Sequence, residues 1–168
     1  MRLRFLVLDA IFLTLIIALK EALAFLPNVE VVTLIFMVVA LLFPLRDSFL
    51  IAFSYATIEG LLYGFGIFSV SYYLVFILIV LITHFFLKKP TYLKAALFSF
   101  FYGLFFDVIF ALPLLASGIK ATIAYLLNGL LFSLAHAVFN FIIALFLFEG
   151  LYKILKTLLE RYGQYGVK

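Results

Sequence analysis

Residues 69–87 read SVSYYLVFILIVLITHFFL, a run without any Asp, Glu, Lys or Arg, and Lys88-Lys89-Pro90 follows it directly. As an α-helix the run is about 28 Å long, close to the roughly 30 Å thickness of the hydrocarbon core of a bilayer. Lysines at the end of an apolar run are typical of the border with a polar phase, and proline cannot continue a helix. The stretch therefore predicts a membrane-spanning helix.

The composition of the whole chain agrees with this. Of its 168 residues, 68% are hydrophobic and only 12% are charged, and the mean hydropathy is +1.34. Too little polar surface is left to cover a water-soluble globule, so the sequence predicts a single all-α integral membrane domain. Cysteine is absent, which excludes disulfides and thiol chemistry. The net charge of +4 does not indicate nucleic-acid binding, because the basic residues lie at the ends of apolar stretches.

Turn signals divide the chain into six apolar stretches. Pro27-Asn28, Gly64-Phe65-Gly66 and Ser117-Gly118 interrupt the helical pattern, because proline lacks a backbone donor and glycine favours chain reversals. We expect a bundle of six transmembrane helices, followed by an amphipathic tail over residues 151–168 that lies along the interface. The predicted spans are residues 3–26, 29–44, 48–65, 69–87, 92–115 and 121–150.

Basic residues are distributed unequally between the two ends of these spans. Only Lys20 and Lys120 fall on one side. Lysine and arginine are retained in cytoplasmic loops, so we expect both termini to be cytoplasmic in a multi-pass protein of a prokaryotic plasma membrane. The basic residues on the cytoplasmic side are Arg2, Arg4, Arg46, Lys88, Lys89, Lys94, Lys153, Lys156, Arg161 and Lys168.

Polar side chains gather at a similar depth in the outer half of the predicted bundle. A charge inside a span costs about 3 kcal/mol on insertion scales, so retained charges usually face protein or water rather than lipid. Five of the six spans contribute a polar group, which predicts a pocket open to the outside. The residues are Lys20, Glu21, Glu30, Glu59, Tyr63, Asp107, Asn128 and His136.

The same residues also have structural interpretations. Glu59 and Lys20 could neutralise each other inside the bundle without any ligand, and Asp107 has the same ambiguity. Glu21 and Glu30 lie close enough to the interface to be merely solvated. A ligand site and an internal ion pair are both open alternatives at this point.

The last span carries polar residues at helical spacing. Gly129, Ser133, His136 and Asn140 share one face, which must be turned toward the bundle. An interhelical hydrogen-bond network and a ligand contact explain this stripe equally well. His84 lies at the opposite end of the bundle, so no complete set of metal ligands is present, and we predict neither a metal nor a cofactor.

The first span carries small residues at a spacing that favours helix association. Ala18 and Ala22 form a small-xxx-small pair, and Ala10 lies two turns earlier on nearly the same stripe. Small side chains allow another helix to approach closely. The stripe is a candidate docking face for a partner protein or a contact inside the bundle itself.

Three segments, in order along the chain, carry a family resemblance. They are PNVEVVT at residues 27–33, EGLLYGFG at 59–66, and GLLF at 129–132 with His136 and Asn140-Phe141 beyond it. In this combination the chain resembles the substrate-specific membrane subunit, or S-component, of energy-coupling factor transporters, whose members have six spans and cytoplasmic termini. The resemblance implies a bundle that captures a vitamin or related micronutrient on the outer face, with the loops at 27–30 and 64–68 covering the pocket.

The resemblance also implies partners. An S-component associates with a transmembrane coupling subunit and two cytoplasmic ATPases, and Ala18 and Ala22, with Ala10, would form its docking face. The chain has no Gly-x-x-x-x-Gly-Lys-Ser/Thr phosphate loop, so we expect no enzymatic activity and an external source of energy. Tryptophan, which relatives often carry, is absent, so the resemblance does not name the vitamin.

For this function we expect rings to stack on the solute and polar side chains to fix its orientation. The expected stacking residues are Tyr63, Phe65, Phe68 and Tyr125, and the expected polar contacts are Asn28, Glu30, Glu59, Asp107, Asn128, His136 and Asn140.

Two other functional classes fit the topology. A non-transporting scaffold, resembling the small six-span cell-shape proteins of bacteria, has no need for carboxylates in its outer half. An intramembrane hydrolase would need a nucleophile or paired-glutamate signature that the sequence lacks.

Overall fold

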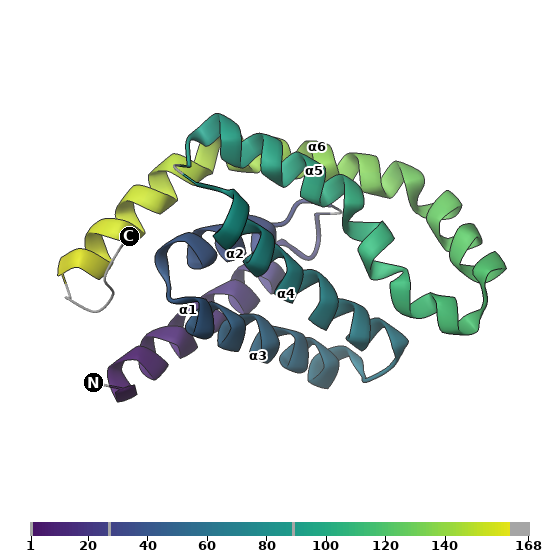
Figure 1. Cartoon of the computed structure of the whole chain (residues 1–168), viewed down its shortest axis with the longest axis horizontal. Coiled ribbons are helices and arrows are strands. Elements are labelled where there is room, and N and C mark those ends of the chain that lie inside the picture. The colour runs from purple at the N-terminus through teal and green to yellow at the C-terminus, as the bar shows by residue number, and fades with distance from the viewer. Residues whose placement is uncertain (1, 27, 89, 162–168) are drawn as a thin grey trace.

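The computed structural model describes residues 2–26, 28–88 and 90–161, and it is all-α over these residues (Figure 1). The predicted helical fold is thereby confirmed. Pro27, Lys89 and residues 162–168, on which parts of the turn, orientation and tail predictions depend, lie outside the described residues. The elements are α1 (Arg2–Leu23), α2 (Val32–Leu42), α3 (Leu45–Tyr63), α4 (Ile67–Phe86), α5 (Tyr92–Phe110), the 3₁₀ helix η1 (Leu112–Ser117) and α6 (Ile119–Arg161).

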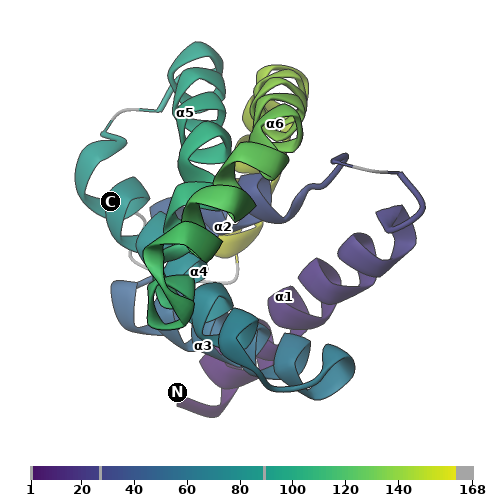
Figure 2. The same cartoon turned by 90° about the vertical axis from the view of Figure 1, so that its right-hand side faces the viewer.

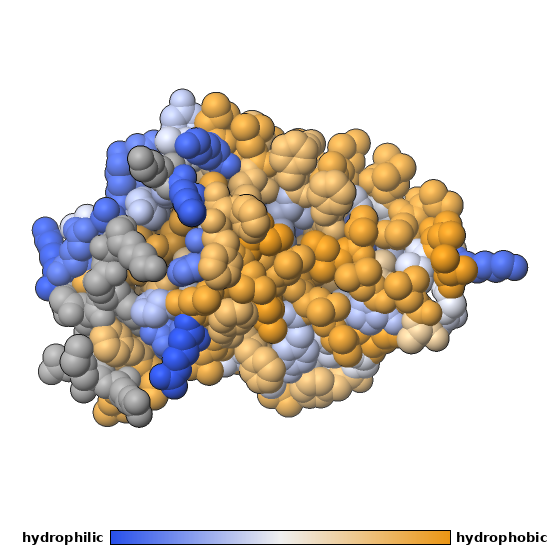
Figure 3. Space-filling view, viewed as in Figure 1, coloured by the Kyte–Doolittle hydropathy of each residue, from blue (hydrophilic) through white to orange (hydrophobic). Residues whose placement is uncertain are grey.

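Three segments of the described chain are long and apolar enough to cross a membrane, namely α4, α5 together with η1, and α6. Large apolar side chains cover much of the surface, and Leu131 and Phe146 on α6 are 81% and 76% exposed. Figure 3 shows hydrophobic residues over most of the visible face, with hydrophilic residues gathered toward the left-hand end. A surface of this kind is stable against lipid rather than water, so these features indicate a membrane protein.

Unusual backbone conformations mark the connections between helices. Gly64 (φ 93°) ends α3, and Gly118 (φ 103°) separates η1 from α6, both in a region of φ that glycine adopts at little cost. Asn28 has a φ of 62°, the left-handed conformation that asparagine tolerates better than most residues. The breaks predicted at these three positions are confirmed.

α2 lies at the centre of the bundle. It has 11 residues, which is about 16 Å along its axis, and all of them except Leu41 are buried. The buried ring of Phe36 has its centroid 5.5 Å from that of Tyr55 and 5.0 Å from that of Phe76. The predicted span 29–44 is therefore helical only in its middle, and the neighbouring helices α1, α3, α4 and α6 cover it.

α5 and α6 form a long pair on one side of the bundle (Figures 1 and 2). α5 ends at Phe110, earlier than the predicted end at residue 115, and η1 then turns the chain into α6. α6 continues for 43 residues without a break at Gly150, so the described part of the predicted tail belongs to the same helix. A Cβ atom on Gly103 of α5 would lie 3.0 Å from Cα of Ala137 on α6, which shows how closely the two helices approach.

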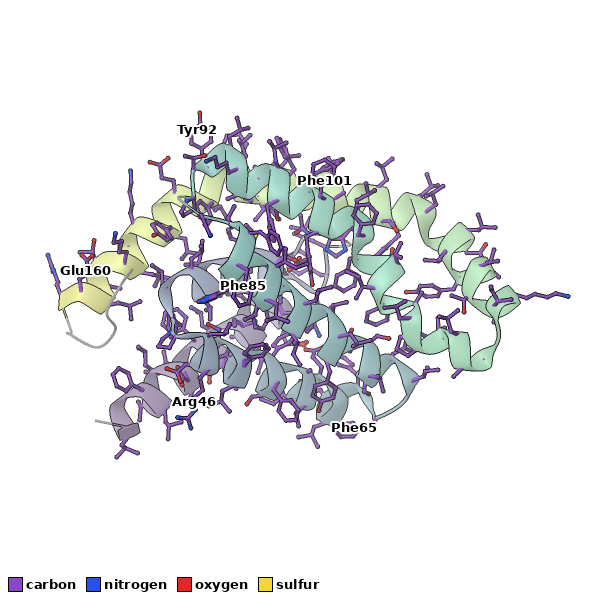
Figure 4. All side chains as sticks on the ribbon, viewed as in Figure 1. Arg46, Phe65, Phe85, Tyr92, Phe101 and Glu160 are labelled. Atoms are coloured by element: carbon purple, nitrogen blue, oxygen red, sulfur yellow. The ribbon has the colours of Figure 1, made fainter. Side chains whose placement is uncertain are left out.

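The two ends of the molecule differ. In Figure 1 the start of α1 and the end of α6 lie at the left-hand end. Figure 4 shows Arg46 and Glu160 toward this end, whereas Phe65, in the connection between α3 and α4, lies toward the other. Figure 2 shows α1 at one side of the bundle, where it packs against α3 and α2. All six α-helices contribute residues to the cavities described next, and Phe65 lines one of them.

Candidate functional site

Two adjacent cavities open among these helices, and Tyr72 of α4 lines both. We call the first the aromatic groove, with a volume of about 670 Å³, and the second the charged cavity, with a volume of about 300 Å³. Both volumes fall within the range of small-molecule sites, roughly 300–1,000 Å³. The aromatic groove is lined by Glu59, Tyr63, Gly64, Phe65, Gly66, Phe68, Ser69, Tyr72, Phe110 and Tyr125. The charged cavity is lined by Lys20, Leu23, Ala24, Leu26, Asn28, Val29, Glu30, Val32, Thr33, Tyr55, Tyr72, Phe76, Phe106, Phe132 and His136.

Lys20 of α1 lies at the junction of the two cavities. Its Nζ atom is 3.0 Å from Oε2 of Glu59 and 3.0 Å from Oε1 of Glu21, and it lies 4.1 Å from the ring centroid of Tyr63. The hydroxyl of Tyr63 donates a hydrogen bond of 2.7 Å to Glu21. The Glu59 side chain is fully buried, whereas that of Lys20 is 23% exposed. The internal ion pair that the sequence left open is therefore formed, and it holds α1 against α3.

Glu30 connects the start of α2 with the middle of α6. Its carboxylate accepts hydrogen bonds from the backbone amide of Thr33 at 2.9 Å and from the Thr33 hydroxyl at 2.5 Å. Oε1 of Glu30 also lies 3.4 Å from Nε2 of His136. The imidazole packs with its centroid 4.9 Å from that of Phe106 on α5. Glu30 is thus a bonded residue of the cavity wall rather than a solvated one.

A second polar group lies between α5 and α6. The Ser133 hydroxyl donates a hydrogen bond to Oδ2 of Asp107, and both residues are buried. Asn140, one helical turn beyond His136, is also buried and lies against Gly103. The predicted orientation of the polar stripe on α6 toward the bundle is confirmed, since Ser133, His136 and Asn140 are all buried.

Several polar atoms of buried or partly buried residues have no hydrogen-bond partner among the described residues. Those that belong to residues lining the two cavities are Oε1 of Glu59, Oδ1 of Asn28 and Nδ1 of His136. The hydroxyl of Tyr55, one turn before Glu59, also interacts with that carboxylate. A buried polar atom without a partner costs about 1–3 kcal/mol, so each of these atoms is a candidate ligand contact.

The structure brings most of the predicted site residues together, but not all. Tyr63, Phe65, Phe68 and Tyr125 line the aromatic groove with Glu59, while Asn28, Glu30 and His136 line the charged cavity. Asp107 and Asn140 are buried outside both linings, and Asn128 is exposed on α6. The carboxylates and amides therefore divide between the cavities, the α5–α6 interface and the outer surface.

The small residues of α1 lie on the outer surface of the described chain. Ala10, Ala18 and Ala22 are exposed, whereas Phe12 and Ile16, on the other side of the same helix, are buried in the core. The small-residue stripe is therefore not covered by another described helix of this chain, which leaves the interpretation as a partner-docking face open.

Several residues of the cavity walls lie outside the predicted site. Thr33, Tyr55, Tyr72 and Phe106 were not included in the predicted site. A signal existed for Thr33, because it lies three residues after Glu30 at the start of a helix, where side chains commonly satisfy free amides. Tyr55 precedes Glu59 by four residues and so shares its helix face.

Within the part of the chain that the structure describes, no group of three or more His, Cys, Asp or Glu side chains could hold a metal ion.

No protein-family model matches the chain, and comparisons with curated proteins and with solved structures gave no significant match. The geometry of the two cavities is therefore the evidence from which a function is inferred.

Proposed function

We propose that the chain is the substrate-binding membrane subunit of an energy-coupling factor transporter and captures a vitamin or related micronutrient outside a prokaryotic cell. In this proposal the chain crosses the plasma membrane six times, with both termini in the cytoplasm. It docks on a transmembrane coupling subunit served by two ATPases, which supply the energy for import. The chain itself is not an enzyme.

One observation carries the proposal: two joined cavities lined by aromatic rings contain buried polar side chains whose hydrogen bonding is incomplete. Glu59 is 1% exposed and His136 is 6% exposed, and each keeps one polar atom without a partner among the described residues. A purely structural ion pair would be expected to satisfy its carboxylate fully, because unmade buried hydrogen bonds are costly. A solute that supplies the missing partners is a simple reason for keeping such groups.

The outer face of α1 supports a membrane partner. Ala10, Thr14, Ala18 and Ala22 follow one another at intervals of four residues, and all four are exposed. The hydroxyl of Thr14 donates to the carbonyl oxygen of Ala10 at 2.8 Å, so it has a partner within its own helix. Such a face allows a helix of another protein to approach closely, as a coupling subunit would require.

Co-purification tests this function directly. The full chain, expressed with an affinity tag in a prokaryotic host that encodes energy-coupling ATPases, should be recovered with those ATPases and with a bound small molecule identifiable by mass spectrometry. The matched variant Ala18→Leu should lose the ATPases and keep the small molecule, because it fills the face and leaves the cavities intact. Recovery only with cell-wall machinery and without a solute would contradict the proposal and favour the scaffold.

The proposed topology can be tested separately, because the chain has no cysteine of its own. A membrane-impermeant maleimide added to intact cells should label Lys120→Cys and leave Arg46→Cys unlabelled until the cells are opened. Both positions are exposed, so failure to react reports sidedness rather than burial. Labelling of both variants in intact cells would refute the six-span orientation.

A further inference from the structure

Two of the three cavity atoms without partners among the described residues are oxygens. Oε1 of Glu59 and Oδ1 of Asn28 can only accept hydrogen bonds. Nδ1 of His136 donates or accepts according to the tautomer of the ring, whose Nε2 is the atom that contacts Glu30 at 3.4 Å. The unpaired oxygens of Glu59 and Asn28 therefore need hydrogen-bond donors.

The charges around Lys20 also favour a hydrogen-bond donor or a cation. The ammonium group of Lys20 is shared between Glu21 and Glu59, at 3.0 Å from each, so one cation serves two carboxylates. Glu30 adds a third carboxylate, whose Oε1 lies 3.4 Å from Nε2 of His136. A negatively charged group placed in the aromatic groove would meet the buried Glu59 carboxylate, whereas a donor or a cation would complete its bonding.

The walls of the aromatic groove favour a flat occupant. Six of its ten lining residues are aromatic. The rings of Phe68 and Phe110 are stacked with centroids 5.6 Å apart, and Tyr125 lies 6.4 Å from Phe68. Aromatic faces attract planar rings and cations, so the walls and the free carboxylate oxygen select for the same kind of molecule.

We infer, on the basis of the proposed solute-binding function, that the cargo is a flat, nitrogen-containing ring that bears N–H donors and no negative charge. Its ring lies among the aromatic side chains of the groove, and one N–H group donates to Oε1 of Glu59. Lys20 remains paired with Oε2 of the same carboxylate. The site therefore discriminates by charge, accepting amidine-like or amino-substituted rings and rejecting their carboxylate counterparts.

Three probes of nearly identical shape test this inference on the unaltered protein. They are 4-fluorobenzamidinium, 4-fluorobenzamide and 4-fluorobenzoate, titrated onto the full chain in a neutral maltoside detergent and followed by fluorine NMR, with empty micelles as the blank. The amidinium ion should bind at least tenfold more tightly than benzoate, with the neutral amide between them. Equal or tighter binding of benzoate, or no amidinium binding beyond the blank, would overturn the inference.

A matched pair of variants locates the effect. Glu59→Gln should weaken amidinium binding about tenfold and change benzamide binding much less, because it removes the charge and keeps an acceptor oxygen. Glu149→Gln removes an exposed carboxylate of α6, outside both cavity linings, and should leave all three affinities unchanged. An equal loss in both variants would exclude Glu59 as the recognition group, and if the first variant does not fold, the selectivity of the unaltered chain still decides.

The outcome separates this inference from the proposed function. A chain that co-purifies with ATPases and a solute but prefers benzoate is still a transport subunit, and only the assignment of its cargo is overturned. A chain that selects the amidinium ion but never associates with ATPases keeps the charge-selective site and loses the proposed transporter.

Discussion

The ion pair between Lys20 and Glu59 offers a quantitative test of how the site is held together. The two side chains have unequal environments. Glu59 is fully buried and pairs with one cation among the described residues, whereas Lys20 is 23% exposed and has a second carboxylate in Glu21. Removing either partner should therefore have different costs. Three variants measure this difference: Lys20→Met, Glu59→Gln and the double variant.

The expected magnitudes follow from these surroundings. Lys20→Met leaves a buried carboxylate without its cation, which should cost about 3–5 kcal/mol of stability. Glu59→Gln leaves Lys20 paired with Glu21 and keeps an acceptor oxygen in place, so it should cost only about 1 kcal/mol. The double variant removes the stranded charge, and we expect it to be more stable than Lys20→Met by about 1–3 kcal/mol.

Unfolding in mixed micelles with an increasing fraction of sodium dodecyl sulfate, followed by far-ultraviolet circular dichroism, measures these differences. Lys153→Met is the matched control, because it breaks an exposed ion pair. The side chain of Lys153 is 70% exposed and that of its partner Glu149 is 52% exposed. The control should change stability by no more than about 0.5 kcal/mol. Additive single effects, or a double variant less stable than Lys20→Met, would refute the view that a buried charge is neutralised here.

Three further predictions concern α5 and α6 and are measured by the same unfolding assay. Gly103→Ala should destabilise the protein by about 1–3 kcal/mol, because its Cβ atom would lie 3.0 Å from Cα of Ala137. Gly150→Ala should instead be neutral or stabilising by up to about 1 kcal/mol, since nothing lies within 4 Å of the new atom. Ser133→Ala removes the donor to the buried Asp107 and should cost about 1–3 kcal/mol, whereas Ser133→Thr, which keeps the hydroxyl, should cost less.

The breaks between helices at Gly64 and Gly118 were predictable because local chemistry sets them. Gly64 and Gly118 have positive φ values, and the chain leaves its helices where these residues occur. Gly150 is also a glycine, yet α6 passes through it without interruption. A glycine inside a helix costs only about 1 kcal/mol, which packing of the neighbouring apolar side chains offsets, as at Phe148, which is 1% exposed.

The role of α2 could not be predicted from hydropathy. Its sequence, VTLIFMVVALL, is as apolar as a span, but the helix has only 11 residues and is covered by protein on nearly all sides. Hydropathy measures how readily a residue leaves water and does not say whether lipid or protein then surrounds it. The distinction depends on the length of the helix and on where the neighbouring helices lie. The length of α2 is known only from its ends at residues 32 and 42.

The site residues show that a sequence predicts the depth of a polar side chain better than the direction in which it points. Counting residues along a span gives the depth of a polar side chain, but the direction in which it points depends on helix rotation, at about 100° per residue. Asn128 was predicted at the depth of the site, yet it lies one residue before Gly129, the first member of the polar stripe, and it is exposed. The stripe of Ser133 and His136 has a period that fixes its direction, which is why that part was predictable. The pairing of Lys20 with Glu59 needs the relative rotation of α1 and α3 as well, and no pattern within either helix determines it.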